Sequence, residues 1–154
     1  MTDRDADTEP TRQCSTDPHL PDVPVMTDAA LQDRVEELIQ RAFRRQLWTL
    51  FFDDEGYQLL MMPMADYPGA PDGPTPEGTA AQLLANRVAY VCDFIGATRV
   101  AFAWERRGPE QSTPVDREWA CGLAAACRNE HVEVWSQFIV HDGGVRWFAR
   151  DDDA

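Results

Sequence analysis

Residues 98–119, TRVAFAWERRGPEQSTPVDREW, constrain the fold of this chain more than any other segment. The run RVAFAW at 99–104 is apolar enough to form a strand that is buried on both faces. A turn rich in Gly, Pro, Ser and Thr follows, and Ser112 or Thr113 can cap a helix that begins directly after it. The segment therefore predicts an inner strand of a sheet that has helices packed against it.

The remaining elements follow in the order α-β-β-α-β-α-β-β. The predicted helices span Thr27 or Asp28 to Phe43, about 79–95 with Gly96 as C-cap, and about 115–129. The predicted strands span 47–52, 57–62, 99–104, 132–140 and 145–149. Arg34, Arg41 and Arg45 lie off the apolar stripe of the first helix, and we expect them on its solvated face. This order predicts an α/β fold, a mixed β-sheet flanked by helices.

Two segments lack the periodicity of a helix or strand. Residues 1–26 are rich in Asp, Thr and Pro, and we expect a disordered acidic tail that precedes a single domain over 27–150. Residues 63–78 contain five prolines and three glycines. They predict a loop that is long for a compact domain, which makes it either functional or mobile.

Composition excludes several classes of function. The formal net charge is −13, and all 14 basic residues are arginine. Such a chain repels nucleic acid over most of its surface, so general phosphate-backbone binding is not expected. The lack of lysine excludes Schiff-base chemistry and a P-loop lysine. No apolar run approaches the length of a membrane span, and there is no signal-peptide pattern, so we expect a cytoplasmic protein.

The strings RQLWTLFFDDEGYQLL (45–60), TRVAFAW (98–104) and STPVDREWACGLAAACRNEHVEVWSQFIVHDGG (112–144) occur in the order and spacing of a known domain. Over 45–148 the chain resembles the JAB/MPN domain of RadC-like proteins. Active members of that family are zinc hydrolases. They carry His-x-His-Pro after the third strand, Ser-x-x-Asp at the start of the next helix, and a glutamate on the second strand as general base.

This chain departs from the pattern at the positions that carry the chemistry. The two histidine positions fall on Trp104 and Arg106, or on Glu105 and Arg107. An arginine there would put a fixed positive charge where the cation should lie. The other degenerate metal-site positions are Val115, for the serine, and Glu118, for the aspartate. The general-base position falls near 61–63, which has no carboxylate. The resemblance therefore implies a domain that has lost its metal ligands, with no cofactor.

The other residues that could act in catalysis or metal binding are typical of structural roles. His19, His131 and His141 are not spaced as ligand pairs, and whether His131, His141 or Glu118 build a different metal site stays open. Asp116 and Glu118 are typical of the first turn of a helix. The cysteines form no CxxC pair, and we expect small buried hydrophobic residues at Cys14, Cys92, Cys121 and Cys127.

The leading hypothesis is a non-catalytic scaffold that binds a protein partner, with the 63–78 loop beside its contact patch. That candidate patch consists of Trp104, Glu105, Arg106, Arg107 and Trp119. An equally weighted interpretation has the two tryptophans packed against each other beneath the turn. The alternatives are a hydrolase with a rebuilt metal site and a binder of an anionic small molecule or nucleotide. Homo-oligomerisation stays open. If the patch binds a partner, Arg106→Ala and Arg107→Ala should weaken binding without unfolding the domain.

Overall fold

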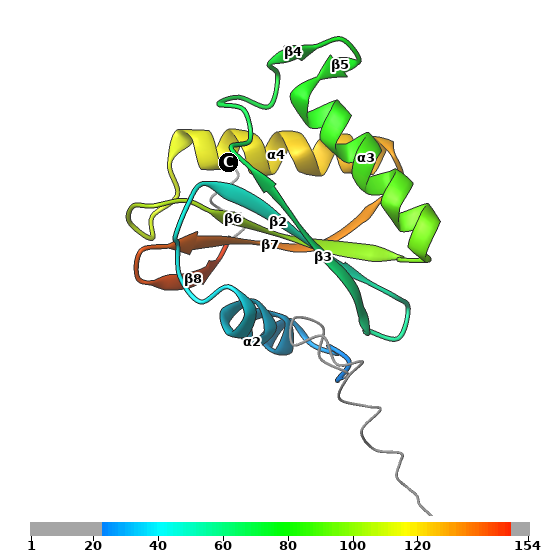
Figure 1. Cartoon of the computed structure of the whole chain (residues 1–154), viewed down its shortest axis with the longest axis vertical. Helices are drawn as coiled ribbons and strands as arrows, with labels where there is room; N and C mark the ends of the chain where they lie inside the picture. The colour runs from blue at the N-terminus through cyan, green and yellow to red at the C-terminus, as the bar shows by residue number, and fades with distance from the viewer. Residues whose placement is uncertain (1–22, 149–154) are drawn as a thin grey trace, which may run out of the picture.

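The computed structural model describes residues 23–148 and contains a mixed sheet covered by helices on both faces (Figure 1). The helices are α2 (Asp28–Leu38), α3 (Ala80–Ile95) and α4 (Pro114–Asn129). The strands are β2 (Gln46–Phe52), β3 (Gln58–Ala65), β4 (Pro74–Thr75), β5 (Gly78–Thr79), β6 (Arg99–Glu105), β7 (Glu133–His141) and β8 (Gly144–Trp147). No helix within 23–148 is both long and apolar enough to cross a bilayer.

The main sheet has the strand order β3-β2-β6-β7-β8. Strand β6 lies at its centre, antiparallel to β2 and parallel to β7, with α4 as the crossover between the two parallel strands. All its residues from Val100 to Glu105 are buried. The α/β class, the mixed five-stranded sheet and the inner position of the third predicted strand are therefore confirmed.

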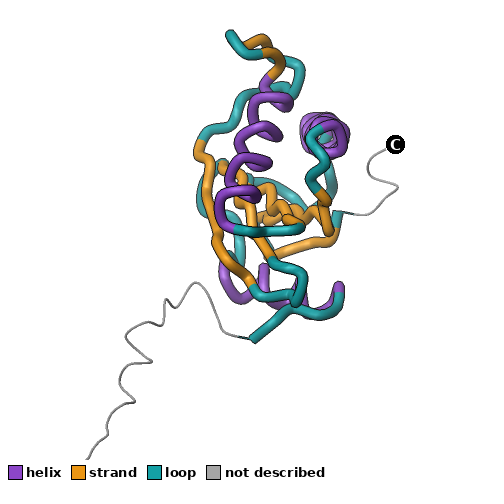
Figure 2. The backbone as a smooth tube through the Cα atoms, turned by 90° about the vertical axis from the view of Figure 1, so that its right-hand side faces the viewer, coloured by secondary structure: helices purple, strands orange, loops and turns teal. Residues whose placement is uncertain are grey.

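Two hydrophobic cores lie on the two faces of the sheet. Figure 2 shows helices on both sides of the strands. Helices α3 and α4 pack on one face over Phe51, Phe102 and Ile139. Helix α2 packs on the other face, where Leu31 and Val35 meet strand residues such as Phe138. Because side chains alternate along a strand, successive residues of β6 serve different cores.

The helices begin where their capping residues predict. Thr27, Thr79 and Thr113 cap the N-termini of α2, α3 and α4, and the last two form capping boxes. Gly96 ends α3 in the left-handed conformation. Helix α2 ends at Leu38, five residues before Phe43, so its predicted C-terminus is wrong.

The loop predicted at 63–78 is partly regular structure. Pro63, Met64 and Ala65 belong to β3, an edge strand, where a proline is tolerated. The short hairpin of β4 and β5 occupies the end of the segment. Between them, Tyr67 is only 4% exposed and packs in the α3–α4 core. The segment is therefore anchored to the domain.

The predicted domain boundary also shifts. Residues 1–22 of the predicted tail lie outside the described part of the chain, but Val25 is 2% exposed and belongs to the α2 core. Arg34 holds this segment, because its guanidinium donates to the Val23 carbonyl and to Gln58 Oε1 at 2.8 Å. The expectation of a solvated Arg34 is wrong, and burial lowers its pKa although Glu37 opposes that shift.

The turn between β2 and β3 needs a glycine at Gly56. Its φ is +89°, and a Cβ atom there would overlap the carbonyl oxygen of Val25. Its own carbonyl accepts the Val25 N–H at 2.7 Å. We expect Gly56→Ala to lower the free energy of unfolding by about 2 kcal/mol, because it combines backbone strain with a steric overlap.

Urea denaturation of Gly56→Ala beside Gly69→Ala measures this effect. Gly69 is a matched control because an added Cβ there meets no atom within 4 Å. Equal urea midpoints for the two variants would contradict the packing of Val25 against the turn.

Candidate functional site

The candidate site lies where β6 ends and α4 begins. Trp104 belongs to the core beneath α3 and α4, and the next side chain, Glu105, contacts residues that precede or belong to β2. Arg106 returns to the α4 side and meets Asp116. Strand alternation thus sends neighbouring residues of the candidate patch to opposite faces of the sheet.

Glu105 is a buried carboxylate that accepts four N–H groups and is 2% exposed. Oε1 accepts Gln46 Nε2 and Trp48 Nε1, both at 2.8 Å. Oε2 accepts the backbone N–H groups of Phe43 and Arg44. Desolvation raises the pKa of the carboxyl, but these hydrogen bonds outweigh it, so the pKa lies below its ordinary value.

This carboxylate also holds the segment that follows the early end of α2. The N–H groups of Phe43 and Arg44 are bound by Glu105, and the Ala42 N–H donates to the His141 carbonyl at 2.8 Å. The segment between α2 and β2 is therefore fixed by the ends of β6 and β7 rather than by helical hydrogen bonds.

Arg106 forms a buried ion pair with Asp116, and the two residues are 8% and 5% exposed. Its Nη2 lies 2.8 Å from Asp116 Oδ2, and its Nε lies 3.2 Å from the same oxygen. The guanidinium also donates to the carbonyls of Pro109 and Gln111. Arg106 thereby ties the end of β6, the turn and the first turn of α4 together.

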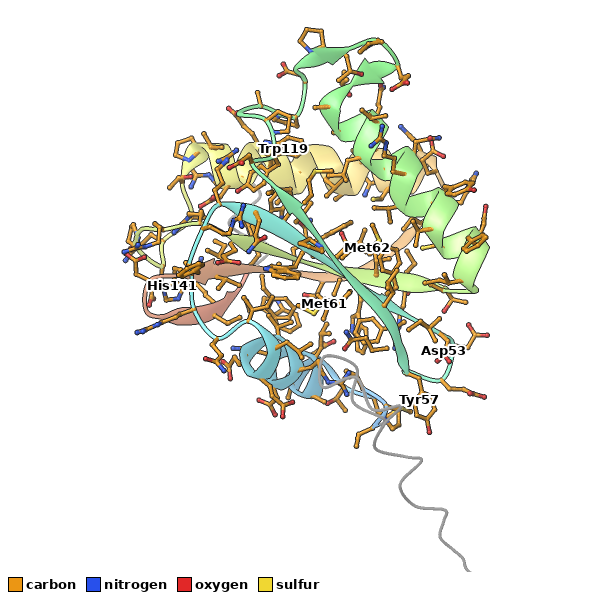
Figure 3. The ribbon with its side chains drawn as sticks, in the orientation of Figure 1. Asp53, Tyr57, Met61, Met62, Trp119 and His141 are labelled. Atoms are coloured by element: carbon orange, nitrogen blue, oxygen red, sulfur yellow. The ribbon has the colours of Figure 1, made fainter. Side chains whose placement is uncertain are left out.

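The two tryptophans of the candidate patch are core residues. Trp104 and Trp119 are each 1% exposed, and their ring centroids lie 5.5 Å apart. Tyr67 contacts both rings edge-on. Trp119 lies where α4 meets the segment after β3 (Figure 3), and its Nε1 donates to the Pro68 carbonyl at 2.8 Å. The interpretation in which these tryptophans pack together is confirmed.

Arg45 holds the same segment from the other side. Its guanidinium carbon lies 3.7 Å from the centre of the Tyr67 ring, and its nitrogens donate to the Tyr67 and Pro68 carbonyls. Arg45 is half-buried by this stacking, so its predicted place on a solvated helix face is wrong.

The candidate patch is therefore not an exposed surface. Trp104, Glu105, Arg106 and Trp119 are buried, and Arg107 is the one member that reaches solvent. The sequence offered no direct sign of this burial, because charged residues are mostly exposed unless they are paired. Arg107 pairs with Asp142 at 2.7 Å, and that contact lowers the pKa of Asp142.

The degenerate metal-site positions do not converge on a site. Val115 and Glu118 are exposed on α4. The acid that faces inward is Asp116, and it forms the capping box with Thr113. The expected place of Asp116 in the first turn of a helix is confirmed. The sequence interpretation assigned the family's aspartate position to Glu118, whereas the spacing Thr-x-x-Asp marks Asp116 as the acid that faces inward.

The general-base position is also without a carboxylate. Met61 and Met62 lie on opposite faces of β3 (Figure 3), and Met61 packs in the core beneath α2. Met62 is 38% exposed. Neither side chain can accept a proton from a bound water.

The histidines and cysteines of the described residues do not build a metal site with neighbouring carboxylates. His141 shares a pocket of about 500 Å³ with Glu36 and Glu110, and its Nδ1 accepts the Gly143 N–H. Within 23–148, no group of three or more His, Cys, Asp or Glu residues is placed to hold a metal ion.

The predicted cysteine environments are mixed. Cys92 and Cys127 are buried, as expected, and burial raises their pKa to about 11 and about 12. Cys121 is exposed, so its predicted burial is wrong. His19 and Cys14 lie outside the described residues.

An exposed basic and aromatic surface lies beside this buried network. We define the connector surface as Arg41, Phe43, Arg44 and Arg107, all of them exposed. Phe43 is 82% exposed although its backbone is fixed by Glu105. Arg107 lies at the same end of the sheet. It pairs with Asp142, which directly follows His141, and the His141 carbonyl accepts the Ala42 N–H.

No protein-family model matches the sequence, and no curated protein is similar to it at a significant level.

Proposed function

We propose that this chain is a non-catalytic protein-interaction module with a JAB/MPN-like fold. One observation carries the proposal. At the junction of β6 and α4, where the resembling family holds zinc, the buried charges satisfy one another through Arg106 and Asp116. A fixed guanidinium there repels a cation and offers no lone pair to it.

The JAB/MPN-like fold is supported by the order of the elements. The strand that would deliver the metal motif is β6, the central strand, and the helix that would carry Ser-x-x-Asp is α4. In this chain Thr113 and Asp116 occupy that spacing, and their side chains cap α4 and bind Arg106. The same junction therefore has a structural role in place of a catalytic one.

The connector surface is the interaction site that we propose. Two of its arginines, Arg41 and Arg44, are exposed beside Phe43 on a chain of formal charge −13, whereas the charge of Arg107 is paired with Asp142. Arg and aromatic residues dominate binding energy at protein interfaces. Glu105 fixes the backbone of Phe43 and Arg44, so less conformational entropy is lost when a partner binds. An acidic protein surface has the matching charge.

Phe43→Ser combined with Arg44→Glu should weaken partner binding at least about tenfold, because it removes an aromatic contact and reverses a charge. Stability should change little, since both side chains are exposed. The measurement is capture of proteins from an extract of the source cells with wild-type and variant chains as bait, followed by titration of the captured partner.

Arg128→Glu is the matched control, because Arg128 is also exposed but lies in the last turn of α4. A partner that is retained by wild type and by Arg128→Glu, and lost by the connector variant, supports the proposal. If the connector variant binds the partner with unchanged affinity, the connector surface is not the binding site.

A further inference from the structure

The outer face of α3 carries two large aromatic side chains that nothing in the described part of the chain covers. Tyr90 and Phe94 are 70% and 79% exposed. Their rings stack nearly parallel, at 10° and with centroids 6.4 Å apart. The opposite face of α3 is buried through residues such as Val88 and Cys92. Helix α3 thus presents a second apolar stripe to solvent, a feature that marks interaction surfaces.

Polar residues border this stripe in a regular way. At about 100° per residue, Arg87 lies on the same edge of the face as Phe94, and Asn86 and Asp93 lie together on the other edge. All three polar residues are exposed. No ion pair of Arg87 occurs within residues 23–148.

We propose that α3 forms a homodimer interface, in which two copies of the helix pack antiparallel about a two-fold axis at Tyr90. Such an axis places a residue that precedes Tyr90 by some number of positions opposite the residue of the second copy that follows Tyr90 by the same number. It also brings the same edge of the face in the two copies to the same side of the interface. Arg87 then faces Phe94 of the second copy, and Asn86 faces Asp93 of the second copy. In each pairing the two residues differ by one position in their separation from Tyr90, so both pairs lie within about 1.5 Å of the ideal two-fold arrangement.

The chemistry of each pairing is complementary, and symmetry makes each occur twice. The Arg87 guanidinium can lie over the opposite Phe94 ring as a cation–π contact. The Asn86 amide can donate to the opposite Asp93 carboxylate. The two Tyr90 rings meet at the axis and exclude water from it. Arg87 and Asp93 of each copy balance one another, so the contact itself is neutral although the two copies, each of formal charge −13, otherwise repel each other.

This inference does not depend on the proposed function, because α3 contributes no residue to the connector surface. Sedimentation equilibrium of the full chain at about 0.3 M salt, which screens the repulsion between copies, tests it. We expect a monomer–dimer equilibrium with half-dissociation at about 10–100 µM, the weak range of a small interface. Tyr90→Ser with Phe94→Ser should be monomeric, with an unchanged urea midpoint. A wild-type chain that stays monomeric up to about 500 µM overturns the dimer.

Substitutions at Asn86 test the arrangement itself. Asn86→Asp places a carboxylate opposite Asp93 of the second copy and should weaken the dimer about fivefold to tenfold. Asn86→Arg places a guanidinium there and should tighten the dimer by a similar factor. The same changes at the exposed Gln111, which lies in the turn before α4, should have no effect. Effects of the same sign for both Asn86 variants would overturn the proposed pairing even if a dimer forms.

Discussion

Glu105→Ala should lower the free energy of unfolding by about 3–5 kcal/mol, because four N–H donors lose their acceptor where the carboxylate was buried. The donors belong to Phe43, Arg44, Gln46 and Trp48. Urea denaturation at pH 7 measures the loss. A variant with a midpoint close to that of wild type would mean that the carboxylate does not organise the segment between α2 and β2.

Glu105→Gln is the isosteric control for this prediction, and it adds a pH dependence. The pKa of Glu105 is lower in the folded protein than its ordinary value of 4.5. Its contribution to stability is therefore present above pH 4.5 and is lost as the pH falls through the lower folded pKa. Wild type should be the more stable protein at pH 7, and the difference should shrink as the pH falls below about 4. A difference that is constant between pH 7 and pH 3 contradicts this account.

Arg106→Ala should also destabilise the domain by about 3–5 kcal/mol, because it leaves the Asp116 carboxylate buried without its cation. It also removes the donors to the Pro109 and Gln111 carbonyls, which hold the turn. The sequence-based expectation that this substitution spares folding is therefore reversed. The urea midpoint and the near-UV circular dichroism of Trp104 and Trp119, which pack beside this junction, report the effect.

Arg107→Ala is the matched control for Arg106→Ala. The two arginines are adjacent in sequence, but the Arg107 side chain is 70% exposed and that of Arg106 only 10%. Arg107→Ala should leave the urea midpoint nearly unchanged, since exposed ion pairs contribute little. Adding Asp116→Asn to Arg106→Ala should recover part of the lost stability, because the buried charge is then removed. Equal effects of the two single arginine variants would contradict the burial of Arg106.

The secondary structure was largely predictable because local chemistry sets it. Threonine caps, the left-handed Gly96 and the apolar run of β6 all act within a few residues of their position. The C-terminus of α2 was not predictable in this way. The apolar stripe continues to Phe43, but Glu105, sixty-two residues away in sequence, binds the N–H group that a longer helix would use.

The candidate site was predictable in position but not in form. The segment 98–119 does bring β6 and α4 together around charged residues. What the sequence could not reveal is which face each side chain takes once the strand is paired. Arg106 and Arg107 are the same residue type at adjacent positions, and only the tertiary contact with Asp116 makes one buried and the other exposed.

The metal content of the purified, untagged chain tests the central claim most directly. We propose that a guanidinium–carboxylate pair occupies the junction of β6 and α4, where the resembling family holds zinc. The chain should be incubated with zinc, dialysed and analysed by atomic emission. The account predicts far less than one zinc per chain, because Asp116 is already bound to Arg106. One tightly held zinc per chain, removed only by a chelator, would contradict the account and direct attention to hydrolase activity.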